Sequence, residues 1–209
     1  GTLFVDADGF IEVFAPDGKA LKTWRGDTTG AALTSIALTD DEVFVADAAN
    51  RVVLRYDKSG LFLNRIGEKD PQKLAEGLLA PSLHLDVAVG IDGMVRVTNP
   101  GRLRIETYAP DGDLKESWGK PAAGISDIEG FCGCCNPTDF ALLYDGRIVT
   151  SEKGIPRVKV YSSTGTFEAV VAPPEAFPQA QCPVGDCRQG KALDVAVDSA
   201  GRILVLDPA

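Results

Sequence analysis

A repeated pattern constrains the fold of this chain more than any other feature of its sequence. Three segments, 41–67, 92–119 and 145–171, share one order of features. Each has a β-branched run, a polar turn, a second alternating run that ends near Tyr, a Gly turn and a third run. Alternation with a period of two, as in the RVKVY run at 157–161, is typical of half-buried strands. The repeat therefore predicts an all-β fold built from a recurring sheet.

A further apolar run precedes each trio, so the repeating unit has four strands, which we call a to d in chain order. These runs read LTSIALT, LHLDVAV, TDFALLY and, near the end, LDVAVDS. The turn before strand d contains Gly18, Gly60, Gly112 or Gly165, at intervals of 42, 52 and 53 residues. Such intervals are in the range of propeller blades. We therefore predict a β-propeller of four-stranded antiparallel blades with the a strands innermost.

The tally of strands predicts that residues 1–209 form a single propeller domain that is incomplete at both ends. The first unit supplies strands b to d, the next three units supply all four, and the last supplies a and b. We expect a six-bladed ring, of which this chain covers about four to five blades, with unpaired strands at the gap. A distorted five-bladed closure is the alternative.

The charge of the chain argues against polyanionic partners. The chain has 30 acidic and 21 basic residues, which gives a formal net charge of −9. Such a surface repels a polyanion, so we expect no nucleic-acid partner. No apolar run approaches the roughly 20 residues that span a bilayer, so we also expect no membrane span. A protein partner or a small ligand is the remaining class.

Five cysteines gather in two short segments. Cys132, Cys134 and Cys135 lie in FCGCCNP, and Cys182 and Cys187 lie in QCPVGDC. Both segments connect a strand d to the next strand a, in adjacent blades. In a propeller these connections lie on one face together with the b-to-c turns. We therefore expect a sulfur of the first segment within about 8 Å of a sulfur of the second.

Three roles for these cysteines stay open at this point. Disulfides would join Cys182 to Cys187 and one clustered cysteine to another partner, and an odd number of five leaves one thiol over. The second role is four thiolates around zinc or an iron–sulfur cluster. The spacings C-x-C-C and C-x4-C match no familiar ligand pattern, however, and Cys134 and Cys135 would point apart along an extended chain. Redox-active thiols are the third role, although no nearby cationic partner is evident in the sequence.

Polar residues on the same face are further ligand candidates. Glu152 and Lys153 occupy the b-to-c turn of the fourth unit, where the alternative is a solvated turn with a charge pair. Asp47 and Asn99 occupy equivalent turns, where they would either contribute oxygens to a calcium site or cap the turns. His84, the single histidine, begins a strand a and would face the channel mouth, with a hydrogen-bonded structural role as the alternative.

The segment VFVADAANRVVLRYDKSG, 43–60, resembles the repeats of the NHL family of β-propellers, with one strand ending on Asp47 and the next opened by Asn50 and Arg51. The run VAVDSAGRILVLDP is similar to the first half of such a repeat. The GCCNP, SEKG and PRVKVY motifs together resemble uncharacterised exported bacterial propellers. The resemblance covers most of the chain and implies a propeller fold and a periplasmic or extracellular location. The family includes binding scaffolds, lyases and sugar or lactone enzymes, so it leaves the activity open.

The expected function is that of a non-enzymatic, exported binding or scaffold module whose cysteine-bearing face is the functional face. One alternative is an electron-transfer or metal-binding protein that carries an iron–sulfur cluster or zinc on the five cysteines. Another is a hydrolase or lyase with its site at the channel mouth. The chain begins GTLFVDADG, without a basic leader or an apolar signal core, so we expect any signal segment to lie outside this sequence.

Overall fold

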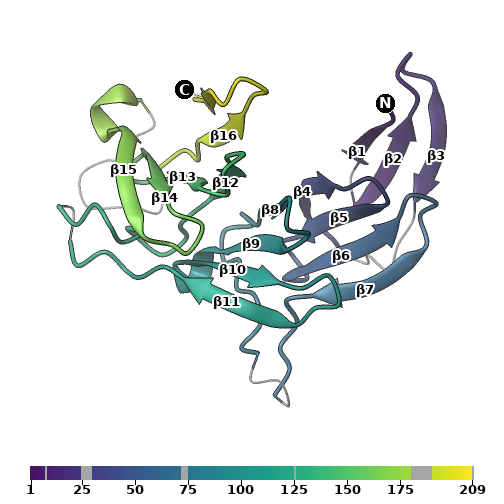
Figure 1. Ribbon diagram of the computed structural model, residues 1–209, viewed down its shortest axis with the longest axis horizontal. Helices are drawn as coiled ribbons and strands as arrows, with labels where there is room; N and C mark the ends of the chain where they lie inside the picture. The colour runs from purple at the N-terminus through teal and green to yellow at the C-terminus, as the bar shows by residue number, and fades with distance from the viewer. Residues whose placement is uncertain (8, 25–29, 72–74, 125, 180–189, 209) are drawn as a thin grey trace.

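The computed structural model describes residues 1–7, 9–24, 30–71, 75–124, 126–179 and 190–208, and within them the strands form five sheets that follow one another along the chain (Figure 1). Neighbouring strands in every sheet are antiparallel. The first sheet contains β1 (Leu3–Ala7), β2 (Phe10–Phe14) and β3 (Ala20–Trp24). The second contains β4 (Leu33–Leu38), β5 (Glu42–Asp47), β6 (Val52–Asp57) and β7 (Phe62–Ile66).

The third sheet contains β8 (Val87–Val89), β9 (Val95–Asn99), β10 (Arg104–Tyr108) and β11 (Leu114–Trp118). The fourth contains β12 (Asp139–Leu142), β13 (Ile148–Glu152), β14 (Arg157–Tyr161) and β15 (Phe167–Ala172). The fifth contains β16 (Asp194–Val197) and β17 (Ile203–Leu206). Two short 3₁₀ helices, η1 (Pro100–Arg102) and η2 (Pro174–Ala176), are the helices of the described chain, and neither is long enough to cross a membrane.

The a strands lie innermost, as the sequence predicts. Each complete sheet is ordered a-b-c-d from one edge to the other. The a strands of successive sheets contact one another, β4 with β8, β8 with β12 and β12 with β16. The sheets therefore fan out from a common line of a strands, which is the arrangement of propeller blades.

Hydrophobic clusters fill the space between successive blades. Strand β5 is buried on both sides because Val43 and Val45 pack toward the first sheet, while Phe44 and Ala46 pack toward the third. Further clusters join the third sheet to the fourth and the fourth to the fifth. Each blade is thus stabilised mainly by its neighbours, since apolar area buried between sheets is the dominant favourable term in folding.

Two tryptophans mark the packing of strand d against the next blade. Trp24 ends β3, and its ring centroid lies 5.8 Å from that of Tyr56 on β6. Trp118 ends β11, and its ring centroid lies 4.9 Å from that of Tyr161 on β14. Their corresponding positions in the repeat predict packing between blades rather than ligand stacking, and the structure confirms it. Each indole also contacts the turn glycine of the following blade, where a Cβ on Gly165 would lie 2.3 Å from Trp118.

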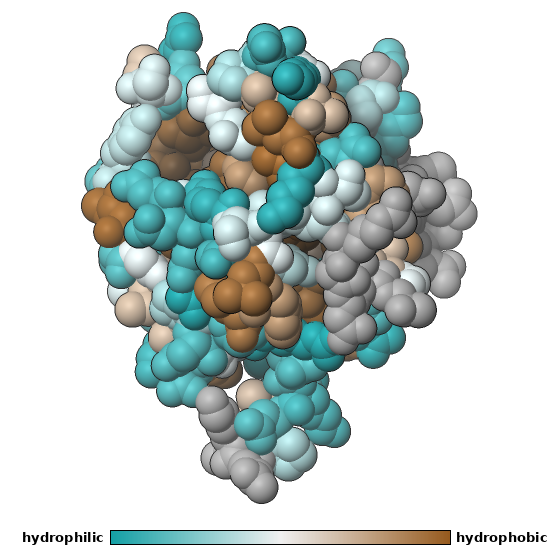
Figure 2. Space-filling model, turned by 90° about the vertical axis from the view of Figure 1, so that its right-hand side faces the viewer, coloured by the Kyte–Doolittle hydropathy of each residue, from teal (hydrophilic) through white to brown (hydrophobic). Residues whose placement is uncertain are grey.

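The first and last sheets stand apart, and their strands do not pair with each other in the described residues (Figure 1). Strand β1 leaves Leu3 and Val5 about half exposed, at 52% and 44%, and β17 exposes Leu206 at 65%. Figure 2 faces the side of the N-terminal sheet and shows clusters of hydrophobic side chains among polar ones. Exposed apolar edge strands are ordinarily paired or covered. The six-bladed ring itself stays a prediction.

Candidate functional site

A cavity of about 260 Å³ opens where the a strands of four blades begin. Its polar lining comes from Thr34, His84, Asp86, Thr138, Asp139 and Asp194. These residues lie in the d-to-a connections or at the first positions of the a strands. The cavity therefore marks the mouth of the propeller axis on the face that carries the cysteines. His84 lines it from the connection before β8, which begins at Val87, rather than from the start of the strand itself.

The aspartates of this axial cavity also tie each blade to the next. Asp86 accepts a hydrogen bond from the backbone N–H of Phe140 in the following blade, at 2.9 Å. Asp139 accepts one from the N–H of Val195, again one blade further on, at 2.9 Å. One blade earlier, the hydroxyl oxygen of Ser35 plays this role and accepts a hydrogen bond from the N–H of Val87 at 3.3 Å. These contacts stabilise the inner ring of strands, because backbone donors buried there need a partner.

Burial and mutual repulsion perturb the carboxyl groups of the cavity. Burial raises the pKa of Asp86 to about 6. Burial, followed by the negative charge of Asp86, raises the pKa of Asp139 to about 9. Asp139 also forms a hydrogen bond with Asp194. The raised pKa favours the protonated form of Asp139, which can donate a hydrogen bond to Asp194, since like charges this close disfavour double ionisation.

His84 lies in the same cavity, where its surroundings favour the neutral imidazole. Its burial is the main cause of a lowered pKa, and the positive charge of Lys153 lowers it further. Lys153 also acts on the thiol of Cys134. The ammonium of Lys153 thus connects the cavity electrostatically to the cysteine segment, and Thr138 of the cavity lies in the same d-to-a connection as the cysteines.

Sequence reasoning missed the three aspartates as a set. Asp86, Asp139 and Asp194 occur at the start of LDVAV, DFALL and LDVAV, which are the innermost strands. A charged side chain that recurs at the start of a buried strand is the signal that could have identified them, because an isolated buried charge is rarely tolerated. The repeated acid lies at the first residue of strand a or directly before it, and not in one of the turns that define the repeat.

Glu152 and Lys153 are buried, so the expectation of a solvated turn with a charge pair is wrong. Glu152 has no exposed surface, and its carboxylate pairs with Lys159 at 2.8 Å and with Arg157 at 3.0 Å rather than with Lys153. Both cations come from β14, which is buried along its whole length. Two cations at alternating positions of a strand share one face, and here that face turns inward toward Glu152.

The carboxylate of Glu152 also holds the cysteine segment. It accepts a hydrogen bond from the backbone N–H of Cys132 at 2.8 Å. Lys159 donates to the carbonyl of Gly130 at 2.9 Å, and its ammonium lies 4.5 Å from the centroid of the Phe131 ring. The d-to-a connection of the fourth blade is therefore fixed by a buried ionic network.

Asp47 and Asn99 hold the connections of their own blades in the same way. Each is the last residue of a strand b, as Glu152 is. Asp47 accepts from the N–H of Ala32 at 3.2 Å, and Asn99 accepts from the N–H of Leu79 at 3.0 Å. This arrangement supports the structural interpretation of these two residues over calcium binding, since their oxygens serve backbone donors.

The clustered cysteines are free thiols of unequal exposure. Cys134 is exposed, Cys132 is partly exposed and Cys135 is buried. The sulfurs of Cys134 and Cys135 lie 3.2 Å apart, so the expectation that these neighbours point apart is wrong. The expectation rested on alternation in an extended chain, but residues 133–135 form a bend rather than a strand. The hydrogen bond with Cys135 is the main cause of a raised pKa of the Cys134 thiol.

Cys182 and Cys187 lie outside the described residues. The predicted approach of the two cysteine segments therefore stays a prediction, as do disulfides that involve either residue. Within the described part of the chain, no group of three or more His, Cys, Asp or Glu side chains is placed to hold a metal ion. A zinc or iron–sulfur site on these cysteines would need Cys182 and Cys187 as ligands.

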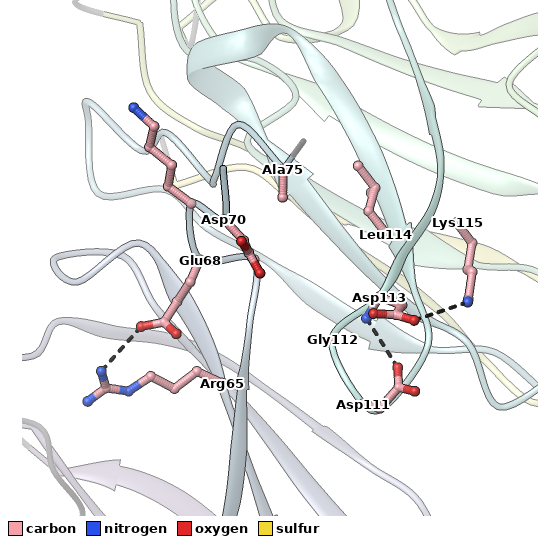
Figure 3. Close-up of a pocket in the computed structure, with 11 residues that line it drawn as sticks. Arg65, Glu68, Asp70, Ala75, Asp111, Gly112, Asp113, Leu114 and Lys115 are labelled. Carbon is pink, nitrogen blue, oxygen red and sulfur yellow. Dashed lines mark hydrogen bonds and ion pairs between the residues drawn. The ribbon is translucent and has the colours of Figure 1, made fainter. Parts of the chain in front are cut away.

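A second cavity, of about 590 Å³, lies between the end of β7 and the turn that precedes β11 (Figure 3). Its charged side chains pair locally, Arg65 with Glu68 at 3.3 Å and Lys115 with Asp113 at 3.7 Å. Such exposed pairs contribute little to binding or stability. None of the candidate residues from the sequence lines this outer groove, so the axial cavity and the cysteine segment beside it form the candidate site.

No family model and no curated protein matches this chain. Among solved structures, a Bacteroides caccae protein of unknown function is 15% identical, with a TM-score of 0.62 over 98% of this chain and 64% of that one. Staphylococcus aureus virginiamycin B lyase is 13% identical, with a TM-score of 0.57 over 100% of this chain and 67% of that one. A chain of a nidogen/laminin complex is 18% identical, with a TM-score of 0.68 over 99% of this chain and 70% of that one.

These identities are too low to transfer an activity, and the chain spans about two thirds of the length of these neighbours. What the similarity does establish is the architecture, because each neighbour is matched over nearly all of this chain. Together with sheets ordered a-b-c-d around a line of inner strands, it identifies the chain as a β-propeller protein.

Proposed function

We propose that this chain is a non-enzymatic, exported binding or scaffold propeller of the NHL type, and that its functional face is the one formed by the d-to-a connections and the cysteines. The observation that carries the proposal is the axial cavity, where polar side chains from four successive blades converge. Ligand sites in such folds are concave and combine a few placed polar groups with apolar walls. A cavity of this size suits a small ligand or a single side chain of a protein partner.

The way in which the connections are held supports this proposal. The connections of the second, third and fourth blades are each anchored by the side chain that ends strand b. A face with fixed loops is pre-organised and loses little conformational entropy on binding. One of the structural neighbours comes from a complex between two proteins, nidogen and laminin, which is consistent with a propeller as a protein-binding scaffold.

Two exposed leucines provide a matched test of which face binds. Leu83 lines the axial cavity and is 52% exposed, whereas Leu114 lines the outer groove and is 38% exposed. The wild type, Leu83→Asp and Leu114→Asp would be immobilised, and bound proteins from periplasmic and secreted fractions quantified by mass spectrometry. We expect a partner that the wild type and Leu114→Asp retain and Leu83→Asp loses. If Leu83→Asp retains the partner and Leu114→Asp loses it, the functional face is the outer groove instead.

The position of a carboxyl and an imidazole with perturbed pKa values in one cavity favours a second candidate, a hydrolase or lyase at the channel mouth. Asp139 and His84 line the same cavity, and their pKa values are shifted in opposite directions by burial. Such a pair can divide the roles of general acid and general base. If the chain turns over a panel of lactones and glycosides, Asp139→Asn and His84→Gln should each abolish the turnover. Unchanged turnover in both variants would exclude the cavity as the active site.

A further inference from the structure

Cys134 and Cys135 form a sulfur pair that gives the third role expected from the sequence, redox-active thiols, a specific location. Their sulfurs lie 3.2 Å apart, closer than two unbonded sulfurs ordinarily pack and too far for a disulfide bond of about 2 Å. Cys134 is exposed, whereas Cys135 is 5% exposed. An outer thiol that solvent reaches therefore faces an inner thiol that solvent does not reach.

The backbone on both sides of the pair is fixed. Before the pair, the N–H of Cys132 donates to the buried carboxylate of Glu152 at 2.8 Å. After it, the amide of Asn136 forms two hydrogen bonds with the backbone of Lys153, accepting from the N–H at 2.9 Å and donating to the carbonyl at 3.1 Å. The amide of Asn136 also donates to the carbonyl of Cys132. These anchors lie within four residues of one another, so the sulfur contact belongs to a supported bend.

We propose that Cys134 and Cys135 are a reversible oxidation site that closes to a vicinal disulfide by exchange with the disulfide of a small thiol or of a partner protein. The thiolate of the exposed Cys134 attacks one sulfur of the co-reactant, whose other sulfur leaves as a thiol with the electron pair and a proton. The sulfur of Cys135 then attacks the Cys134 sulfur of this mixed disulfide and releases the second thiol. Two S–H bonds of the protein are replaced by one S–S bond, and the co-reactant is reduced to two thiols.

Because the two cysteines are adjacent, a disulfide between them would be reversible rather than stabilising. Adjacent Cα atoms are about 3.8 Å apart, below the range of about 4.4–6.8 Å that disulfides prefer. A disulfide between them is therefore strained, and strained exposed disulfides are the ones that cellular thiols reduce readily. The bond also encloses no further chain, so it adds no loop-closure stabilisation. This inference concerns the thiols alone and does not depend on which face binds a partner.

A variant that keeps only this pair tests the proposal. Cys132→Ser, Cys182→Ser and Cys187→Ser would be combined, and the protein equilibrated with mixtures of oxidised and reduced glutathione, alkylated and digested with trypsin. We expect the peptide 116–147 to lose two hydrogens and to escape alkylation, and dithiothreitol to reverse both changes. The same protein with Cys134→Ser is the matched control and should show neither change.

The contribution of the fold is measured by repeating the equilibration in urea. Because the native bend holds the sulfurs in contact, we expect half-oxidation of the folded protein at a lower ratio of oxidised to reduced glutathione than in urea. An equal or higher ratio for the folded protein would overturn the proposal. If the combined variant does not fold, peptide mapping of the oxidised wild type would instead identify which cysteines are bonded to each other. A bond from Cys134 or Cys135 to the 182–187 segment would then refute the vicinal site, and a bond within 134–135 would support it.

Discussion

Removing the charge of Glu152 should destabilise the fourth blade more than any exposed charge change. In Glu152→Gln, the ammonium of Lys159 and the guanidinium of Arg157 stay buried, at 0% and 3% side-chain exposure, without their counter-charge. Breaking a buried ion pair by removing one partner costs about 3–5 kcal/mol, because the remaining charge is desolvated and uncompensated. That is a large share of the roughly 5–15 kcal/mol by which a domain is stable.

Urea unfolding followed by tryptophan fluorescence measures this loss. Trp118 reports on the region, because its ring centroid lies 6.4 Å from that of Phe131 in the anchored segment. Glu68→Gln is the control, since the exposed pair of Glu68 with Arg65 should contribute at most about 1 kcal/mol. Cys135 should also react faster with a thiol reagent in Glu152→Gln, because the charge-assisted hydrogen bond from the N–H of Cys132 becomes a weaker bond to a neutral amide.

A second substitution separates the charge effect from a general loss of packing. Lys159→Met removes one of the two buried cations and keeps most of its volume, so adding it to Glu152→Gln should restore part of the lost stability. The reasoning is refuted if Glu152→Gln is no less stable than Glu68→Gln, or if the double variant is less stable than Glu152→Gln alone.

Two further predictions concern the cavity and the turns. The folded pKa of Asp139, about 9, exceeds the unfolded value of about 3.9, so stability from this group is fully present below pH 4 and is lost as pH rises through 9. Asp139→Asn should flatten this decline, by up to about 1.4 kcal/mol per pH unit between pH 5 and 8 in urea titrations. Gly165→Ala should be about 1–3 kcal/mol less stable than Gly18→Ala, because both positions have positive φ but only Gly165 lies against Trp118. Equal losses in thermal unfolding would contradict the second prediction.

The architecture could be predicted because it depends on local patterns that occur several times. Period-two alternation defines each strand, and the turn glycines set the register between repeats. Because the pattern repeats, a strand wrongly predicted in one segment conflicts with the strands predicted at the same position of the other segments. The pairing of Trp118 with the next blade was predictable for the same reason, because Trp24 holds the equivalent position.

The environment of the site residues could not be predicted in the same way, because it depends on contacts between segments that differ from blade to blade. The letters SEKG are typical of a solvated turn, and only the inward cations of RVKVY make Glu152 a buried counter-ion. Likewise, the alternation that places neighbouring side chains on opposite sides holds in strands, but not in the bend that brings the Cys134 and Cys135 sulfurs together.

A comparison of the blades bears on whether the connection of the fourth blade needs its cysteines as a structural cross-link. The connections before β4 and β8 contain no cysteine, and Asp47 and Asn99 hold them through the same strand-end position that Glu152 occupies. The fourth connection has this anchor as well, strengthened by Arg157 and Lys159. A further staple would add little to a segment already fixed by a buried ionic network. The connection is thus anchored without its thiols, which supports the proposed oxidation site over a structural disulfide. The charge of Lys153, which acts on both Cys134 and His84, links this pair electrostatically to the axial cavity.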